Sequence, residues 1–123
     1  MTTIATSSKE FFEEYIGAMS GLPKTEALLD KYVSDPVLKE HVLQFEAAFP
    51  NYQVEIEDLV AEGELVALRG KFHGTHNGAF AGIPATGKEI TADIAGFYRI
   101  ENQKVSKFWL IADTTKLLNE LQG

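Results

Sequence analysis

The chain has 123 residues, of which 45% are hydrophobic and 24% charged, and its formal net charge is −7. This length and composition fit one globular domain, residues 1–123, and exclude a chain that is disordered throughout. There is no cysteine, so disulfides, thiolate metal ligands and a cysteine nucleophile are excluded. The acidic balance argues against nucleic acid and anionic membranes as partners, and a cytoplasmic location is the default expectation.

Three helices are predicted in the first part of the chain, each with a capping residue. Ser7, with Glu10 three residues later, forms a capping box. Thr25 is the expected N-cap of a second, short helix. Asp35 caps a third helix that has Pro36 at its first position, where the missing N–H costs nothing. Apolar residues recur at helical spacing after these caps: Phe12, Tyr15, Ile16 and Met19; Leu28, Leu29, Tyr32 and Val33; Leu38, Val42, Phe45 and Phe49.

From Gln53 onward the apolar residues alternate with polar ones, which predicts strands. Further strands are expected over Leu65–His73 and Glu89–Ile100, followed by a final strand that contains Trp109. The third strand has apolar groups on both faces, so a central place in the sheet is expected. A short closing helix follows. Helices first and antiparallel strands afterwards indicate an α+β fold in which the helices pack on one curved sheet.

A glycine-rich segment between the second and third strands has the spacing of a phosphate-binding P-loop. Gly82, Gly87 and Lys88 match that motif, but Glu89 stands where a Ser or Thr would hold magnesium. A strand is predicted after the segment, so no helix N-terminus would receive the anion. A hairpin loop in which Pro84 fixes a turn is therefore the preferred interpretation.

Each of the three histidines is a candidate for chemistry. His73 and His76 invite a metal interpretation, but residues three apart on a strand point to opposite faces, and no third ligand stands at a suitable interval. No metal is therefore expected. Two interpretations stay open for these histidines: one of them lines a pocket, or they are solvent-facing loop residues. His41 lies beside the apolar stripe of the third helix, where a core-edge role is expected.

Asp113 ends the apolar run of the last strand and is the clearest candidate acid or base. Strand alternation places it on the face shared by Trp109 and Ile111, so a cavity on that face would raise its pKa towards neutrality. Such a group can take a proton from a carbon next to a carbonyl and return one to oxygen. Asp113 also precedes the closing helix, where it would be an ordinary N-cap. Asp93 on the neighbouring strand has a weaker claim.

Several short motifs follow one another in order from Leu28 to the C-terminus. They are Phe49-Pro50-Asn51-Tyr52, residues 61–70 (AEGELVALRG), Gly74-Thr75-His76-Asn77-Gly78, residues 82–88 (GIPATGK), Tyr98-Arg99-Ile100, and Trp109 with Asp113 four residues later. Together they resemble the SnoaL-like polyketide cyclase family. The resemblance implies a cone-shaped fold similar to nuclear transport factor two, with a strongly bent antiparallel sheet packed on three N-terminal helices around an apolar cavity. It also implies a homodimer and catalysis without a cofactor.

The resemblance carries over to individual residues. In cyclases of this family an acidic residue at the position of Asp113 is the acid/base of an intramolecular aldol closure. The resemblance therefore favours a catalytic role for Asp113 over a role as helix N-cap. His76 matches the family's Gly-Thr-His-x-Gly histidine and is expected to face the pocket. Many members have His where this chain has Phe108, and several have His-Asn-Pro where it has Ser34-Asp35-Pro36. Fewer polar partners for an enolate are therefore expected.

The leading hypothesis is a cofactor-independent enzyme that performs acid/base chemistry on a small hydrophobic carbonyl substrate, by aldol-type cyclisation or isomerisation. Its predicted catalytic residues are Asp113 and His76. The predicted pocket-lining residues are Trp109, Ile111, Phe97, Tyr15 and Tyr32. One alternative is a non-catalytic small-molecule binding protein of the same fold, and another is a hydrolase or dehydratase that uses the same carboxylate.

Overall fold

The computed structural model describes residues 7–112 and 114–122, and it has the α+β architecture expected from the sequence. Helices α1 (Ser8–Met19), α2 (Glu26–Tyr32) and α3 (Pro36–Ala48) come first. Strands β1 (Gln53–Glu62), β2 (Leu65–Thr75), β3 (Glu89–Glu101) and β4 (Lys104–Ala112) follow, and α4 (Thr114–Gln122) comes last. No described helix is long and apolar enough to cross a membrane.

The N-terminal ends of the first three helices are where the capping residues predicted them. The Ser7 side chain accepts a hydrogen bond from the backbone N–H of Glu10 at 3.1 Å. Thr25 caps α2 in the same way, through the N–H of Leu28. Asp35 caps α3, and Pro36 is the first residue of that helix. Local hydrogen bonding therefore fixes the starts of α1 to α3.

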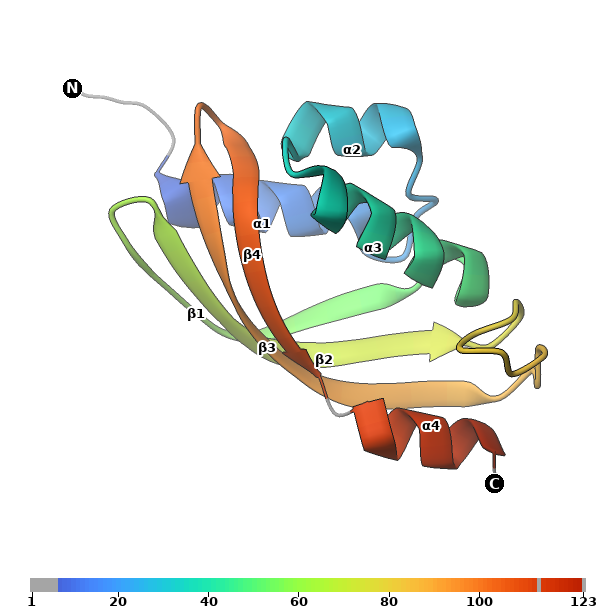
Figure 1. Ribbon diagram of the computed structural model, residues 1–123. Coiled ribbons are helices and arrows are strands. Elements are labelled where there is room, and N and C mark those ends of the chain that lie inside the picture. Colours follow the sequence, from blue (N-terminus) through green and yellow to red (C-terminus); the bar gives the residue numbers. More distant parts are fainter. Residues whose placement is uncertain (1–6, 113, 123) are drawn as a thin grey trace.

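The four strands form one antiparallel sheet in which each strand pairs with the next, in the order β1-β2-β3-β4. β3 lies between β2 and β4, as its two apolar faces predicted. The sheet bends strongly, and α1, α2 and α3 lie on its concave side (Figure 1). The buried core is made where the inner faces of these helices meet the inner face of the sheet.

Two irregularities accompany the bend. One extra residue, Glu57, interrupts the pairing of β1 with β2, and one extra residue, Ser106, interrupts the pairing of β3 with β4. Gly70 faces the first of these bulges, and a Cβ atom there would lie 2.1 Å from the carbonyl oxygen of Glu55. Only glycine allows this close approach, so Gly70 is a requirement of the bend.

Candidate functional site

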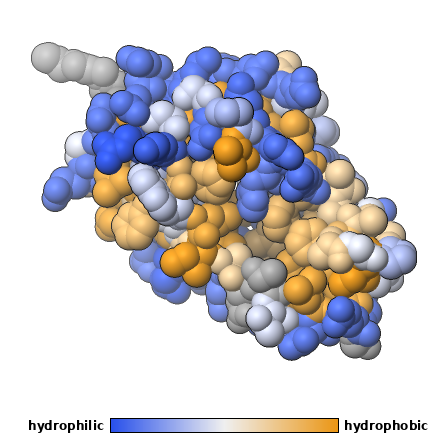
Figure 2. Space-filling view, in the orientation of Figure 1, coloured by the Kyte–Doolittle hydropathy of each residue, from blue (hydrophilic) through white to orange (hydrophobic). Residues whose placement is uncertain are grey.

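A cavity of about 420 Å³ lies between the concave face of the sheet and the helices. Its size falls in the range of small-molecule sites. Figure 2 shows hydrophobic side chains around a hollow on the face between α3 and α4. The lining comes from α1, α3, α4, the sheet and the segments before β1 and β3: Tyr15, Met19, Leu38, His41, Val42, Phe45, Tyr52, Val54, Leu68, Phe72, Phe80, Ala92, Ile94, Tyr98, Phe108, Leu110, Ala112 and Leu117.

Three tyrosines supply most of the polar groups of this apolar wall. Tyr15 comes from α1, Tyr52 directly precedes β1, and Tyr98 comes from β3. All three are buried, and their hydroxyls make no hydrogen bond to another described residue. Burial raises the pKa of each phenol above its ordinary value, and the nearby Tyr98 hydroxyl adds to the rise at Tyr15. The phenols therefore stay protonated and act as hydrogen-bond donors.

His41 is the imidazole at the cavity. It lies on the inner side of α3, with its ring centroid 4.7 Å from that of Phe45 and 5.8 Å from that of Phe108. Burial lowers the pKa of His41 from its ordinary value, so the ring is neutral at pH 7. A neutral imidazole can accept a proton at one nitrogen and donate at the other. His41 was expected to be a core-edge residue, and its place in the cavity wall makes it a functional candidate instead.

Tyr52 is held in place by a buried ammonium group. The Lys24 Nζ lies 4.0 Å from the centre of the Tyr52 ring and donates a hydrogen bond of 2.8 Å to the Tyr52 carbonyl. It also pairs with Glu46 at 3.2 Å, and that carboxylate accepts a hydrogen bond from the backbone N–H of Asn51. These contacts fix the backbone from which the Tyr52 ring enters the cavity.

His76 lies away from the cavity lining. It is fully buried in the loop between β2 and β3, where its Nδ1 accepts a hydrogen bond from the backbone N–H of Thr86. Its ring centroid is 5.4 Å from that of Phe49. Its backbone N–H bonds to the carbonyl of Lys88, and its carbonyl accepts from the N–H of Gly87. The structure therefore gives His76 a part in organising this loop, whereas the sequence predicted that it faces the pocket.

Three of the predicted pocket residues lie on the opposite side of the sheet. Phe97, Trp109 and Ile111 are 48%, 49% and 72% exposed, and none of them lines the cavity. The bulge at Ser106 explains the error for β4. It changes which residues face inward, so that Val105 is buried while Phe108, Leu110 and Ala112 line the cavity.

Of the two other predicted pocket residues, Tyr15 and Tyr32, one lines the cavity and one does not. Tyr15 lines the cavity as expected. Tyr32 is buried, but its hydroxyl donates to Glu14 and its side chain is not part of the lining. Asp113 lies outside the described residues. Because Trp109 and Ile111 face outward, strand alternation no longer gives a reason to expect Asp113 at the cavity, and its predicted role depends on the family resemblance alone.

The other candidates have structural partners. His73 lies on the outer face of the sheet, next to Glu55 and Thr91. Asp93 pairs there with Lys71 at 2.7 Å, and this contact lowers the pKa of Asp93. Within residues 7–112 and 114–122, no group of three or more His, Asp or Glu side chains could hold a metal ion.

The segment with P-loop spacing is a hairpin loop. Its tight turn consists of Ala81 and Gly82, both with positive φ, between the mutually hydrogen-bonded Phe80 and Ile83. Lys88, which would contact phosphate in a P-loop, donates to the carbonyl of Glu120 near the end of α4. The loop thus anchors α4 and carries Phe80 into the cavity wall.

Comparisons with known proteins agree with this architecture. The model of the SnoaL-like polyketide cyclase family matches residues 18–121. The chain belongs to the SnoaL-like polyketide cyclase family. No curated protein matches this family member. This chain is similar to the solved structure of a proposed polyketide cyclase from Acidithiobacillus ferrooxidans, with 26% identity, a TM-score of 0.78 and 98% of each chain covered.

Two further solved structures share the fold of this family member. A SnoaL-like polyketide cyclase from Agrobacterium tumefaciens is 19% identical, with a TM-score of 0.77, and the match covers 95% of this chain and 99% of that one. AclR from Streptomyces galilaeus is 24% identical, with a TM-score of 0.79, and the match covers 94% of this chain and 80% of that one.

Proposed function

We propose that this SnoaL-like protein binds a small hydrophobic carbonyl compound and catalyses proton transfer at the carbon next to the carbonyl, without a cofactor. The observation that carries the proposal is the cavity itself. Its wall is apolar except for three neutral phenols and one neutral imidazole. Such a wall favours an apolar ligand that has a hydrogen-bond acceptor. Aldol-type cyclisation and isomerisation both begin with this proton transfer.

In the reaction, a base takes a proton from the α-carbon, and the electron pair of the C–H bond delocalises onto the carbonyl oxygen. In an isomerisation, the proton returns to a different atom of the same conjugated system. In a cyclisation, the enolate carbon attacks a second carbonyl of the same molecule, and the new alkoxide receives the proton. Both courses need one group that accepts and returns a proton, together with donors that stabilise the enolate oxygen.

Two residues are proposed to move the proton. Asp113 is the acid/base by its match to the family's catalytic position. His41 is the second candidate, because it is neutral and lines the cavity. Its ring lies beside Phe108, the residue that replaces a histidine found in many family members. An imidazole from α3 thus stands next to the place where those members carry one.

The proposal is tested by following proton exchange at the α-carbon of a small apolar ketone in heavy water, with Asp113→Asn and His41→Gln beside the unchanged protein. We expect each variant to bind the ketone and to exchange its proton more slowly. If both variants kept the full exchange rate with unchanged stability, neither residue would be the base.

A non-catalytic binding protein is the second candidate function. The observation that favours it is that the described lining contains no carboxylate. A titration of Asp113 by carbon-detected NMR separates the two. A pKa near the ordinary value of about 4 would favour a passive binder, and a raised pKa would favour the acid/base role.

We also propose that the protein forms a homodimer through the outer face of the sheet. Phe97 and Trp109 are directly opposite each other on β3 and β4, and Ile111 lies two residues further along the same face. Oppositely charged pairs, including Lys71 with Asp93, lie beside them. A face with an apolar centre and charges of both signs can pair with a second copy of itself.

A further inference from the structure

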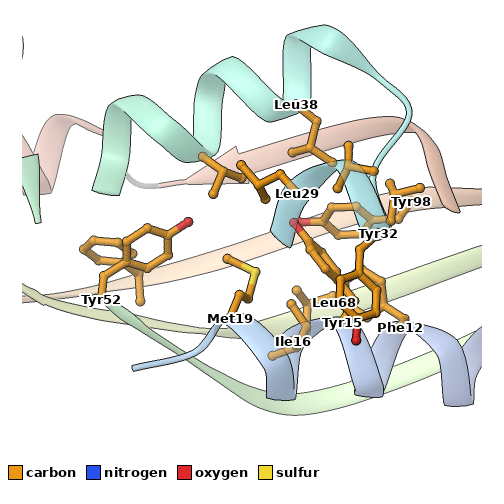
Figure 3. Packing of buried hydrophobic residues seen from close by; sticks show 14 of the residues in the cluster. Phe12, Tyr15, Ile16, Met19, Leu29, Tyr32, Leu38, Tyr52, Leu68 and Tyr98 are labelled. Carbon is orange, nitrogen blue, oxygen red and sulfur yellow. The ribbon is translucent and has the colours of Figure 1, made fainter. Parts of the chain in front are cut away.

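Tyr15, Tyr52 and Tyr98 line the cavity, and packing of the described residues gives no reason for their hydroxyl groups. Tyr15 enters the cavity from α1, Tyr98 from β3 and Tyr52 from the segment directly before β1, and other side chains hold their rings from outside the cavity. Phe12, which is fully buried, packs against Tyr15 and Tyr98 with ring centroids at 5.8 and 4.6 Å. Lys24 holds Tyr52. In Figure 3 the hydroxyls of Tyr15 and Tyr98 point to the same region, and the hydroxyl of Tyr52 points towards it.

The hydroxyls have no partner in the described part of the chain, although the fold could have given them one. Tyr32 provides the comparison, because it is equally buried and its hydroxyl donates to Glu14 at 3.1 Å. Among the described side chains, the one polar atom that is both sealed from solvent and unpartnered is His76 Nε2. The three unpartnered phenol oxygens therefore open onto the cavity space. Buried donors of this kind need a hydrogen-bond acceptor from outside the chain.

The ligand must offer an acceptor atom to the three phenols, which stay protonated and donate hydrogen bonds. Burial raises the pKa of Tyr15, Tyr52 and Tyr98, so at neutral pH each phenol stays protonated and can donate a hydrogen bond. The remaining wall is apolar apart from His41, which makes a freely hydrated anion a poor ligand. An uncharged carbonyl oxygen on an apolar body fits both conditions. Donors aimed at this oxygen would bind it more tightly as charge develops on it during enolate formation.

We propose that the hydroxyls of Tyr15, Tyr52 and Tyr98 form a donor site for the carbonyl oxygen of an apolar ketone. The inference rests on the proposed function, because it takes the cavity as the ligand site. It defines the substrate class further: the ligand has its acceptor oxygen at one end, directed to the phenols. Charged carboxylates and pure hydrocarbons of the same shape are both disfavoured.

The test compares two ligands of matched shape, 2-acetonaphthone and 2-isopropenylnaphthalene, in which a CH₂ group replaces the carbonyl oxygen. Their affinities are measured for the unchanged protein, for Tyr15→Phe, Tyr52→Phe and Tyr98→Phe, and for Tyr32→Phe as the matched control. Each cavity variant should weaken ketone binding by about three- to tenfold, the effect of one neutral hydrogen bond, and leave alkene binding unchanged. The control variant should change neither affinity.

A second measurement does not depend on affinity or on catalysis. The carbonyl stretching frequency of the bound ketone should be lower than in an apolar solvent and should rise in each cavity variant. Equal effects of the variants on both ligands, with no shift of the carbonyl band, would overturn the donor site while leaving the cavity as a ligand site. If neither ligand bound to the unchanged protein, the cavity function and the donor site would both be wrong.

Discussion

Lys24 and Tyr52 form a buried pair in which the ammonium group lies 4.0 Å from the centre of the phenol ring. The same ammonium donates to the Tyr52 carbonyl and pairs with Glu46. Desolvation lowers the pKa of Lys24, and the bond to Glu46 opposes this effect. Lys24 therefore links Glu46 on α3 to Tyr52, one of the three tyrosines of the cavity.

Replacing Lys24 by Met should therefore destabilise the protein. The change leaves Glu46 and two carbonyl oxygens without their donor, and we expect a loss of about 2 kcal/mol in the free energy of unfolding. Urea denaturation measures this loss. Lys39→Met is the control, because Lys39 pairs with Asp30 in a more exposed position and its removal should cost well under 1 kcal/mol. Equal losses in both variants would contradict the supporting role of Lys24.

His41 should make stability depend on pH. Its pKa is lowered in the folded state, so between that value and the ordinary value of 6.5 the unfolded chain binds more protons than the folded chain. The contribution of His41 is complete above pH 6.5 and declines as the pH falls through this window. The urea midpoint of the unchanged protein should therefore fall more between pH 7.5 and 5.5 than that of His41→Leu. Parallel midpoints would show that the ring is not desolvated.

Asp113→Asn should reduce turnover by about 10² to 10⁴-fold once a substrate is known, because general acid/base catalysis contributes this much. Binding of the substrate should change little. Asp30→Asn serves as the control, since Asp30 lies on α2 and its side chain is 64% exposed. Full turnover by Asp113→Asn, with stability unchanged, would remove Asp113 from the mechanism.

The outer face of the sheet should carry the dimer contact. Trp109→Glu places a charge in the centre of the apolar patch and should convert a dimer to a monomer in sedimentation experiments at micromolar concentration. Val37→Glu is the control, because Val37 is 64% exposed on α3, away from the patch. A sedimentation mass of one chain for the unchanged protein would refute the dimer itself.

Two glycines should respond in opposite ways to alanine. Gly70→Ala brings a Cβ to 2.1 Å from the Glu55 carbonyl oxygen, so we expect a loss of about 2 kcal/mol or more. Gly17 lies within α1 with no atom near its Cβ position, so Gly17→Ala should stabilise by about 0.5–1 kcal/mol. Thermal unfolding of both variants checks the pair. Little change at Gly70 would show that the bend does not depend on this close contact.

The sequence was sufficient for the parts of the fold that depend on neighbours in the chain. Ser7, Thr25 and Asp35 predicted the starts of the three helices because a cap is a local hydrogen bond. Alternation predicted the strands that begin at Gln53. It failed for Trp109, since the extra residue at Ser106 depends on pairing with β3 and leaves no local mark on the sequence.

The candidate site could be predicted only in part. Tyr15 was identified because it belongs to the apolar stripe of α1. The sequence predicted a core-edge role for His41, although its place three residues after Leu38 and four before Phe45 puts it on the inward stripe of α3. Tyr52 and Tyr98 both belong to the motifs that resemble the family, but they lie far apart in the chain, and their approach to Tyr15 follows from the bend of the sheet.

The most direct test of the central claim is the rate at which 2-tetralone exchanges its α-protons in heavy water when it is bound to the protein. Val42→Trp, which should fill the cavity, is measured beside the unchanged protein, and binding is confirmed separately. We predict exchange accelerated about a hundredfold or more over free solution, and loss of that acceleration in the filled variant. Exchange of the bound ketone at the free-solution rate would contradict acid/base catalysis in this cavity.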